Sequence, residues 1–387
     1  MARHIKICRV VKNYPRCGEE IYVLLQPYFL SALIEEQTMV ITRKKPGKPW
    51  PLPPHAHIVE ISYRDVPFSD YLEVEAFTGG RKTLRQKLKV MFRVILKTRE
   101  ITFMLKAMPG LLRYRPDIVH CHAFIMILPG IFSKIFTKSK LIVTLHSAVD
   151  TMMLKKSRVL RRLLGFADRI FCVSSDIKND LLPYFPESRF EMTPNGVDLS
   201  LFKNLGLPRE NRLIAVGTFR WYKGYKYLVR AMKLIVEKHP DFSLVICGDG
   251  LDRPEIEEEI RRLKLERHVT ITGMISQERI VELLNRSKIY VMSSVVEGFP
   301  KALVEALACG APAVLTTACA AGDVVKDTAL TVEPENPEAF AETVCRLISD
   351  EELWRKLAGA CAGAVEKYDW SRIAGDVKRI YHSLVPS

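Results

Sequence analysis

The chain has 387 residues, of which 48% are hydrophobic and 26% charged, and its formal net charge is +14. This length predicts two domains, and this composition is that of a globular protein with ample core. The sequence contains no run of about 18 apolar residues, which excludes a predicted membrane-spanning helix. The start "MARHIKICRV" has no apolar signal segment, and the nine cysteines form no C-x-x-C. We therefore expect a cytoplasmic protein with reduced thiols.

The positive charge is concentrated in the first half of the chain. Residues 1–200 hold 32 Lys and Arg against 18 Asp and Glu, which leaves 26 of each kind for residues 201–387. Such an asymmetry between halves indicates an anionic partner for the basic half.

Short β-branched runs alternate with longer helical patterns, which is typical of parallel α/β sheets. The polar, Gly- and Pro-marked segment 198–212 separates two such series. We expect an N-terminal domain at residues 1–203, a C-terminal domain at residues 204–369, and a helix at 370–387 that returns to the N-terminal domain. The predicted strands are, in order, "HIKICRVV", "TMVITRK", "HIVEIS", "DIVHCH", "LIVTLH", "RIFCVSS", "LIAVGTF", "SLVICGDG", "VTITG", "IYVMSS" and "PAVLTT".

The final predicted helix, "WSRIAGDVKRIYHSLV", follows Asp369, which can cap it. Ile373, Val377, Ile380 and Leu384 form its apolar stripe. Both predicted sheets are doubly wound, and such sheets bind ligands at the carboxyl ends of their strands.

Two glutamates stand eight residues apart in the nearly apolar segment "SSVVEGFPKALVEALACGAPAV", at Glu297 and Glu305. Gly298 and Pro300 suit a turn that starts a helix running to Cys309. The helix N-terminus offers backbone N–H groups to a phosphate, while carboxylates accept hydrogen bonds from sugar hydroxyls. This pattern favours a sugar-phosphate site. The plain alternative is a helix with one solvated glutamate at each end.

The segment "EGFPKALVE" resembles the E-x7-E motif of the retaining glycosyltransferases of family 4, which have the GT-B fold of two Rossmann-like domains facing across a cleft. Further segments that resemble the family follow its order: "TPNGVDLSLF", "VGTFRWYKGYKYLVRAM", "VICGDG", "VTITGMIS" and "PEAFAETV". The resemblance implies that Glu297 contacts hydroxyls of the transferred sugar and that Glu305 holds the nucleotide ribose. From the same segment we expect donor binding by Gly298, Phe299, Lys301, Ala302 and Leu303.

The loop "GTFRWYKG" follows a strand and leads into a helix. Arg220 and Lys223 can clamp a diphosphate and neutralise its growing charge as the sugar leaves. A solvated basic loop is the alternative. Thr218 stands where the family often has arginine, so Arg220 is the weaker of the two candidates. Gly248, in "GDG", is expected in a turn beneath the nucleotide base, although a plain strand-to-helix turn fits equally.

In the first half, "YPRCGEE" resembles the family's N-terminal glycine loop, and Gly18 would let the backbone approach the donor diphosphate. An ordinary loop glycine is the alternative. His120 and His122 point to one face of a predicted strand and His146 ends the next one, and three imidazoles can bind zinc. No carboxylate or cysteine completes that set. The resemblance places His146 beside the transferred sugar, and we interpret His120 as structural.

No D-x-D motif occurs, so we expect neither a metal nor any other cofactor. The sequence also lacks a P-loop and a G-x-S-x-G motif. Nucleic-acid binding finds no helix-turn-helix, ribonucleoprotein motif or zinc finger to support it. We therefore expect a retaining hexosyltransferase that uses a nucleotide diphosphate sugar and a glycan, lipid-linked or other anionic acceptor. A sugar-nucleotide epimerase on the same fold, or a degenerate member that binds polyanions or membranes, remains open.

A basic stripe runs through "RKTLRQKLKVMFRVILK", where Arg85, Lys89, Arg93 and Lys97 recur every four residues. A second basic cluster lies at 154–164. These faces either pack on the N-terminal sheet with solvated charges or rest on an anionic membrane. The second hypothesis predicts peripheral attachment at the inner face of the cell membrane.

Overall fold

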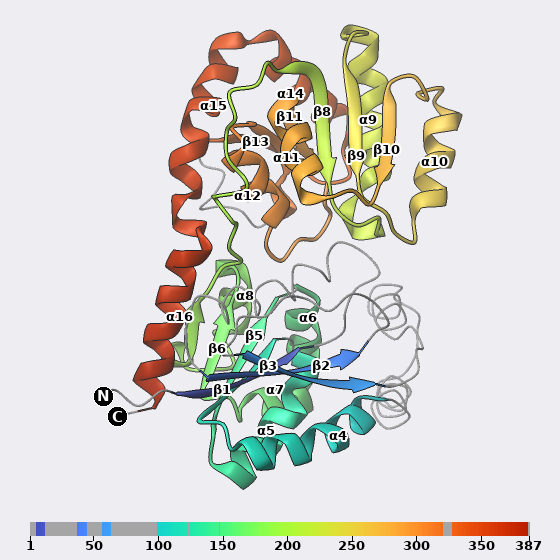
Figure 1. The fold of residues 1–387 in the computed structure, drawn as a ribbon. Helices are drawn as coiled ribbons and strands as arrows, with labels where there is room; N and C mark the ends of the chain where they lie inside the picture. Colours follow the sequence, from blue (N-terminus) through green and yellow to red (C-terminus); the bar gives the residue numbers. More distant parts are fainter. Residues whose placement is uncertain are drawn as a thin grey trace. The chain divides into compact units, whose positions relative to one another are not determined.

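Two parallel sheets organise the chain (Figure 1). The computed structural model describes residues 5–11, 37–44, 56–62, 99–122, 124–146, 148–319 and 327–385. Among these residues, one sheet has seven strands in the order β3-β2-β1-β4-β5-β6-β7, and the other has six in the order β10-β9-β8-β11-β12-β13. Neighbouring strands are parallel throughout both sheets, which confirms the α/β class predicted from the alternating pattern.

The first sheet and its helices come from the N-terminal half. The strands are β1 (Lys6–Val11), β2 (Gln37–Lys44), β3 (Ala56–Ser62), β4 (Ile118–His122), β5 (Lys140–Leu145), β6 (Arg169–Cys172) and β7 (Phe190–Met192). The helices are α4 (Arg99–Tyr114), α5 (Ile127–Thr137), α6 (Ala148–Lys156), α7 (Arg158–Leu164) and α8 (Ser175–Leu181), with 3-10 turns η1 (Phe124–Met126) and η2 (Glu187–Arg189).

The second sheet and its helices come from the C-terminal half. The strands are β8 (Glu210–Val216), β9 (Ser243–Cys247), β10 (Val269–Gly273), β11 (Ser287–Met292), β12 (Ala313–Thr316) and β13 (Ala329–Val332). The helices are α9 (Tyr225–Lys238), α10 (Arg253–Arg262), α11 (Gln277–Arg286), α12 (Lys301–Ala308), α14 (Pro337–Ser349), α15 (Glu351–Val365) and α16 (Trp370–Leu384), with 3-10 turns η3 (Trp221–Lys223), η4 (Thr317–Cys319) and η5 (Glu366–Tyr368).

Helices cover both faces of the second sheet. Successive residues of a strand point to opposite sides, so the central strand contributes side chains to the core on each face. On β8, Leu213 and Ala215 belong to the core cluster that includes α9 and α14 residues. Ile214, between them, belongs to the other cluster, with residues of α11, α12 and α15. All three side chains are at most 3% exposed. The segment Leu213–Ala215 of this strand is therefore buried on both faces, as expected for a continuous apolar run.

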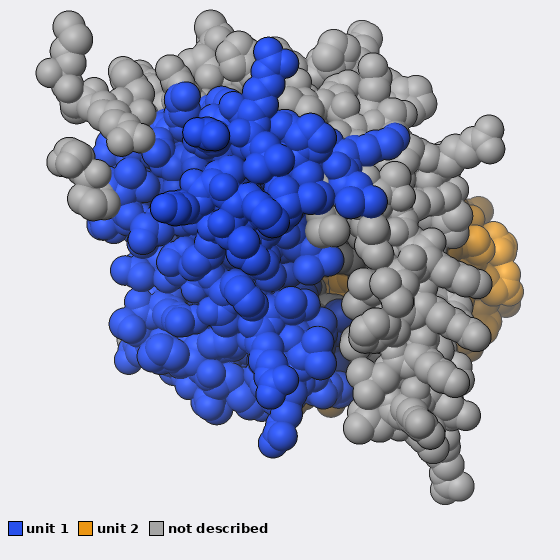
Figure 2. All heavy atoms as spheres, turned by 90° about the horizontal axis from the view of Figure 1, so that it is seen from below, with its two compact units in different colours: residues 1–14, 23–193, 374–387 blue, residues 15–22, 194–373 orange. Residues whose placement is uncertain are grey.

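The chain forms two compact units, which Figure 2 distinguishes by colour. Unit 1 contains the described residues up to Thr193 and those from Ala374 onward, and unit 2 contains Pro194–Ile373. The units thus divide ten residues before the sequence-based division between 203 and 204. Residues from Ala374 to the end of α16 belong to unit 1, so the described residues of unit 1 lie on both sides of the segment 194–373 in the sequence.

The buried face of α16 differs from the predicted stripe by one residue. Ile373, Val377 and Leu384 are buried as expected, but Tyr381 is fully buried in place of Ile380. Tyr381 takes this position because its hydroxyl meets a buried polar group of unit 1, described below. Asp369 accepts a hydrogen bond from the Ser371 backbone N–H at 2.8 Å, in keeping with its predicted capping role. No helix of the described residues is both long and apolar enough to cross a membrane.

Candidate functional site

The strand order of unit 2 reverses between β8 and β11, which pair directly. Ligands of doubly wound sheets bind where the order reverses, beyond the carboxyl ends of the strands. Residues 217–224 leave β8 at this point, and residues 293–300 leave β11. The two loops are joined, since the Val295 N–H donates to the Tyr222 carbonyl at 2.7 Å and the Ser293 hydroxyl donates to the Lys223 carbonyl at 3.0 Å. The predicted site residues of both loops therefore share one place in the fold.

Two glycines make the approach of these loops possible. Gly224 has φ +65°, and a Cβ built there would lie 2.0 Å from the Ser293 carbonyl oxygen. Gly248 passes so close to the end of β8 that its Cβ would lie 1.9 Å from the Gly217 oxygen. Only glycine fits either position. Gly248, predicted to lie beneath the base, thus has a clear packing role here.

Lys223 and Glu297 form an ion pair across the two loops. The Lys223 Nζ lies 2.6 Å from the Glu297 Oε2, and the two side chains are only 10% and 11% exposed. The other carboxylate oxygen, Oε1, accepts a hydrogen bond from the Gly298 N–H at 3.1 Å. Both oxygens of the Glu297 carboxylate thus have a partner, and the positive charge of Lys223 compensates its negative charge at the end of the sheet.

A second ion pair lies one turn into α12. The Lys301 Nζ is 3.1 Å from the Glu305 Oε1, and the two side chains are 10% and 1% exposed. Burial raises the pKa of Glu305 and lowers the pKa of Lys301, and in each case the partner's charge opposes the shift. Neither oxygen of Glu305 has a hydrogen bond of good geometry, although both are inaccessible to solvent. Both oxygens of the buried Glu305 carboxylate can therefore still accept hydrogen bonds, for example from a ligand.

Two backbone N–H groups in the first turn of α12, which the sequence analysis offered to a phosphate, already form internal hydrogen bonds. The Lys301 N–H donates to the Phe299 carbonyl at 2.9 Å, and the Leu303 N–H donates to the Pro300 carbonyl at 3.0 Å. The Leu303 side chain is fully buried in the core, while Phe299 and Ala302 are partly buried against it. A phosphate at this helix end would compete with these internal bonds.

Arg220 lies near an acidic residue that the sequence analysis did not single out. Burial raises the pKa of Asp252, Glu255 adds to that effect, and the positive charges of Arg220 and Lys226 oppose it. Arg220 begins the η3 turn, where its carbonyl accepts the Lys223 N–H at 2.8 Å. The charge of Arg220 thus acts on Asp252, whereas the Lys223 Nζ lies against the Glu297 carboxylate.

Three buried hydroxyls near these loops have no hydrogen-bond partner: those of Thr218, Tyr290 and Ser294. Burial raises the pKa of Tyr290 well above its ordinary value, and the charges of Glu297 and Glu305 contribute to that shift. The sequence analysis noted Thr218 only as a departure from the family pattern and missed Tyr290 and Ser294, because tyrosine within a strand and serine after one are too common to stand out. Unused polar groups at a reversal point indicate a place built for a polar ligand.

In unit 1 the three predicted histidines form a row. The rings of His120 and His122 stack with centroids 4.0 Å apart, and those of His122 and His146 are 6.0 Å apart and nearly parallel. Burial lowers the pKa of His120 and His122 well below the ordinary value, and the charge of Arg9 adds to the shift in both cases. The part of the chain that the structure describes contains no group of His, Cys, Asp and Glu that could hold a metal ion.

His120 is part of a buried network that ties α16 to the first sheet. Its Nδ1 lies 2.6 Å from the Tyr381 hydroxyl, and its Nε2 lies 2.6 Å from the Thr144 hydroxyl. Arg9, which is fully buried, donates to the same Tyr381 oxygen at 3.0 Å. This bonding agrees with the structural interpretation of His120. Arg9, a charged residue inside a predicted strand, was a sequence signal for a buried polar network, but no sequence pattern indicated that its partner is Tyr381.

Some predicted residues lie outside the described residues. These are Gly18 of the N-terminal glycine loop and the basic stripe of Arg85, Lys89, Arg93 and Lys97.

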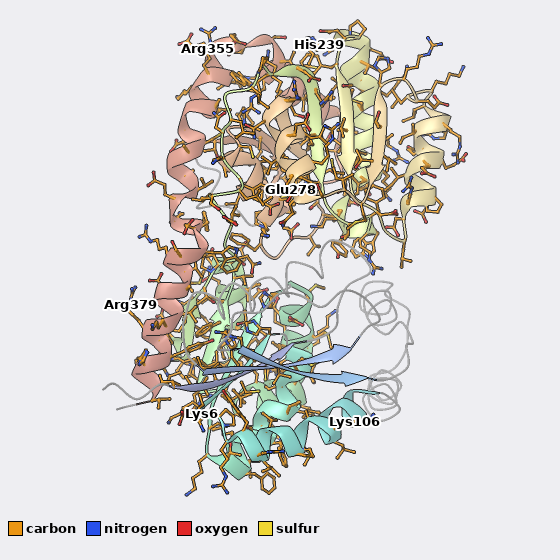
Figure 3. All side chains as sticks on the ribbon, viewed as in Figure 1. Lys6, Lys106, His239, Glu278, Arg355 and Arg379 are labelled. Carbon is orange, nitrogen blue, oxygen red and sulfur yellow. The ribbon has the colours of Figure 1, made fainter. Side chains whose placement is uncertain are left out.

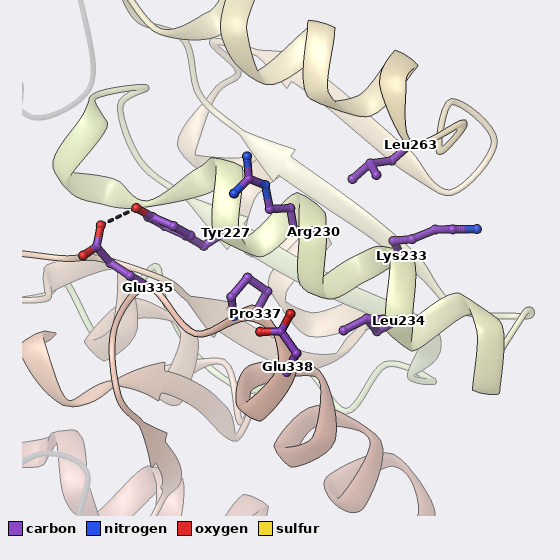
Figure 4. Close-up of a pocket in the computed structure, with 8 residues that line it drawn as sticks. All are labelled: Tyr227, Arg230, Lys233, Leu234, Leu263, Glu335, Pro337 and Glu338. Atoms are coloured by element: carbon purple, nitrogen blue, oxygen red, sulfur yellow. Dashed lines mark hydrogen bonds between the residues drawn. The ribbon is translucent and has the colours of Figure 1, made fainter.

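A hollow of about 350 Å³ lies elsewhere on unit 2, beside α9 and the start of α14 (Figure 4). Tyr227, whose hydroxyl donates to Glu335, lies on its wall with Arg230 and Glu338. None of the predicted site residues lines it. The strand-order reversal, which gathers the paired charges, is therefore the better candidate site.

Family models match most of the chain. Residues 55–201 match Glycosyltransferase Family 4, and residues 199–360 match Glycosyl transferases group 1. A relative from Methanocaldococcus jannaschii, named as an uncharacterized glycosyltransferase, is 30% identical over 275 residues, which cover 69% of this chain and 76% of the relative. The chain belongs to this family of glycosyltransferases and is an enzyme that uses a sugar-nucleotide donor.

Solved structures show the same architecture, the GT-B fold. Sucrose-phosphate synthase from Thermosynechococcus elongatus has a TM-score of 0.77 at 21% identity, over 98% of this chain and 99% of that one. HepE from Anabaena, solved with UDP and glucose, has a TM-score of 0.74 at 17% identity, over 98% of this chain and 100% of its own. The predicted family and fold are thus confirmed.

Proposed function

We propose that this enzyme is a retaining glycosyltransferase that moves a hexose from a nucleotide diphosphate sugar to an acceptor bound by unit 1. The observation that carries the proposal is the buried Lys223–Glu297 ion pair at the strand-order reversal. It joins a cation suited to a diphosphate with a carboxylate suited to sugar hydroxyls. HepE, which has this fold, was solved with UDP-glucose, and this supports a nucleotide sugar as the donor.

In this proposal each charged group has one task. Glu297 accepts hydrogen bonds from hydroxyls of the hexose, and Glu305 accepts them from the ribose. Lys223 neutralises the diphosphate as the bond between the anomeric carbon and the phosphate oxygen breaks. The acceptor oxygen bonds to that carbon on the same face, and its proton passes to the departing phosphate. No side chain is required as a nucleophile, and protein charges take the place of a metal ion.

The remaining predicted residues belong to the proposal as donor contacts. Gly18 would contact the diphosphate and His146 the hexose, and Gly298 and the start of α12 would contribute further donor contacts. Arg220 is the weakest member, because its charge acts on Asp252. We also keep the hypothesis that the acceptor is a glycan or a lipid-linked molecule and that Arg85, Lys89, Arg93 and Lys97 face an anionic membrane.

The test has two stages. UDP-, GDP- and ADP-sugars are first screened by thermal shift, since a ligand at 100 times its dissociation constant stabilises the folded state by about 2.7 kcal/mol. The stabilising donor is then incubated with candidate acceptors, and NMR of the product's anomeric proton gives its configuration. A product with the donor's configuration supports the proposal. Inversion at the anomeric carbon contradicts it, and an altered sugar formed without acceptor would instead indicate an epimerase.

A further inference from the structure

Arg9 is a charged residue in the interior of unit 1. It lies within β1, and its side chain is completely buried. Lys6, which begins the same strand and is labelled in Figure 3, is exposed to solvent. A buried charge is costly unless an opposite charge or a full set of hydrogen bonds compensates it. The neighbours of Arg9 should therefore include such compensation.

The guanidinium of Arg9 uses only one of its nitrogens. Its Nη1 donates to the Tyr381 hydroxyl at 3.0 Å. Its Nε and Nη2 are inaccessible to solvent and have no hydrogen-bond partner among the described residues. Nε–H and Nη2–H project side by side from the planar guanidinium, and this fork binds a carboxylate or a similar anion through two parallel hydrogen bonds. The unsatisfied side of Arg9 is therefore the side that suits an anion.

Arg209 of unit 2 shows how this chain satisfies an arginine without an anion. It is partly buried, and its two Nη atoms donate to the backbone carbonyls of Leu284, Ser287 and Cys309 at 2.6, 2.9 and 2.6 Å. Carbonyl dipoles thus surround that guanidinium. Arg9 has no such surroundings within the described ranges, since the one acceptor that it meets there is a hydroxyl.

The direction of the hydrogen bonds around Arg9 leaves its charge in place. An arginine can only donate, so the Tyr381 oxygen accepts from Arg9, and its single O–H donates to the His120 Nδ1, 2.6 Å away. The His120 Nε2–H then donates to the Thr144 hydroxyl at 2.6 Å. Every member beyond Arg9 is neutral in this arrangement. The network therefore orients the Arg9 side chain but supplies no negative charge.

The titratable groups around Arg9 are neutral as well. Burial raises the pKa of Tyr381 above its ordinary value and the pKa of Cys8 well above its own, so neither carries a negative charge near pH 7. Burial lowers the pKa of His120 and His122, so neither is an additional cation. The end of α16 contributes at most the partial charge of a helix dipole, about half a unit. No carboxylate of the described residues forms an ion pair or a hydrogen bond with Arg9.

His122 lies on the same side of the sheet as Arg9. Strand β1 pairs with β4 so that Arg9 lies beside His120 and Val11 beside His122, and alternate residues of a strand share one face. The His122 ring is fully buried and stacks on His120, with centroids 4.0 Å apart. Neither of its ring nitrogens has a hydrogen-bond partner in the part of the chain that the structure describes. A neutral imidazole carries one N–H, so His122 offers a further donor near the charge of Arg9.

We propose that the fork of Arg9 holds one compact monovalent anion, with His122 as a further N–H donor. An anion fits better than a buried water molecule, because water accepts these hydrogen bonds but cannot neutralise a full positive charge. A small ion such as chloride or formate fits better than a larger one, because the unsatisfied nitrogens of both side chains are inaccessible to solvent. The ion compensates the charge where α16 meets the first sheet. This site lies in unit 1 and does not depend on the proposed function.

The test is differential scanning calorimetry of the full chain while sodium gluconate, a salt with a much larger anion, is replaced by sodium chloride or sodium formate at constant ionic strength. An ion that binds the folded state raises the unfolding midpoint, Tm, with its concentration. We expect each tenfold rise in chloride or formate above its dissociation constant to raise the Tm of the wild type by roughly 3–5 °C.

Arg9→Met tests the fork, and Arg209→Met is its matched control. Arg9→Met should lose the chloride dependence, and in gluconate it should be at least as stable as the wild type, because an uncompensated buried charge is gone. Arg209→Met should lose stability, because three carbonyls lose their donor, but should keep the wild-type chloride dependence. His122→Phe keeps the stacked ring and removes one donor, so the dissociation constant of chloride should rise about tenfold or more.

Bromide soaked into wild-type crystals locates the ion directly by its anomalous scattering, so the proposal is tested even where Arg9→Met does not fold. Bromide at hydrogen-bonding distance from the Nε and Nη2 of Arg9 supports the proposal. Three results overturn it. These are no bromide at the fork, a wild-type Tm that does not respond to chloride or formate, and a chloride response that Arg9→Met retains, since the last would be a general effect of salt.

Discussion

Lys223 and Glu297 are 74 positions apart in the sequence, yet the Lys223 Nζ lies 2.6 Å from the Glu297 Oε2. One belongs to the loop after β8 and the other to the loop after β11, and these strands are neighbours only because the strand order reverses there. The topology thus brings the two predicted catalytic charges together before any ligand arrives. Removing either one leaves a poorly solvated charge behind, so both members must be tested together.

Lys223→Met and Glu297→Gln should each lower kcat/KM by about 100-fold or more, as expected when one polar contact to the transition state is lost. Because the two groups form one ion pair, the double variant should lose less than the sum of the single losses. Steady-state kinetics of all four proteins measure this coupling. Near-normal transfer by Glu297→Gln would show that the hexose binds elsewhere.

The Lys301–Glu305 pair allows stability and binding to be separated. Lys301→Met should destabilise unit 2 by about 3–5 kcal/mol, because it leaves a buried carboxylate without its cation. Lys301→Met/Glu305→Met should recover most of that stability but not nucleotide affinity, since an apolar pair cannot accept the ribose hydroxyls. Denaturant unfolding and calorimetry with the nucleotide diphosphate give the two quantities. Wild-type affinity in the double variant would contradict the role of Glu305.

Gly224 and Gly206 make a matched pair, because both have φ +65° but only Gly224 is crowded. A Cβ at Gly206 meets nothing within 4 Å, so Gly206→Ala should cost about 1–2 kcal/mol from backbone strain alone. Gly224→Ala should cost more and also reduce activity, since it displaces Ser293 and the loop that carries Glu297. Equal losses of stability with equal activity would mean that the two loops do not need their close approach.

The buried histidines predict acid sensitivity. Burial holds the pKa of His120 and His122 below the ordinary value, so the folded state stays neutral while the unfolded chain takes up protons near pH 6.5. The unfolded state then binds more protons, so the contribution of these two histidines to the free energy of unfolding is constant above that pH and falls as the pH drops below it. His122→Phe should reduce this slope by about 1.4 kcal/mol per pH unit. Unfolding curves between pH 5 and 7.5 measure it, and an unchanged slope would contradict the neutral state of His122.

Transfer should survive EDTA, because Lys223 supplies positive charge for the diphosphate at the candidate site. Activity is measured before and after chelation, and again after adding Mg²⁺ or Mn²⁺. Loss on chelation that either ion restores would overturn the metal-free mechanism.

The sequence predicted the central strands well, because β4, β5, β8 and β11 each contain at least three consecutive buried residues, most of them apolar. It missed β7 and β13, which have three and four residues and partly exposed side chains. Such short strands are formed by pairing at the sheet edge and leave little periodic signal.

The candidate site was predictable in its residue types but not in its pairings. Lys301 and Glu305 are four residues apart on a helix, so their contact could have been read from spacing. The partnership of Lys223 with Glu297 depends on two strands meeting in the sheet, which no local pattern specifies. The same holds for Tyr381, whose hydroxyl bonds to Arg9 across 372 positions.

That last contact bears on how the chain is made. Arg9 is synthesised before the residues 194–373 of unit 2, and Tyr381, its hydroxyl partner on α16, is synthesised after them. Until residues 374–384 are synthesised, the first sheet holds a guanidinium with no acceptor at Tyr381, although every other element of unit 1 already exists. The described residues of unit 2 all lie between Pro194 and Ile373, so this part of the chain can fold before unit 1 is complete. A fragment that ends at residue 193 would therefore remain an unfinished folding intermediate and would not form an independent domain.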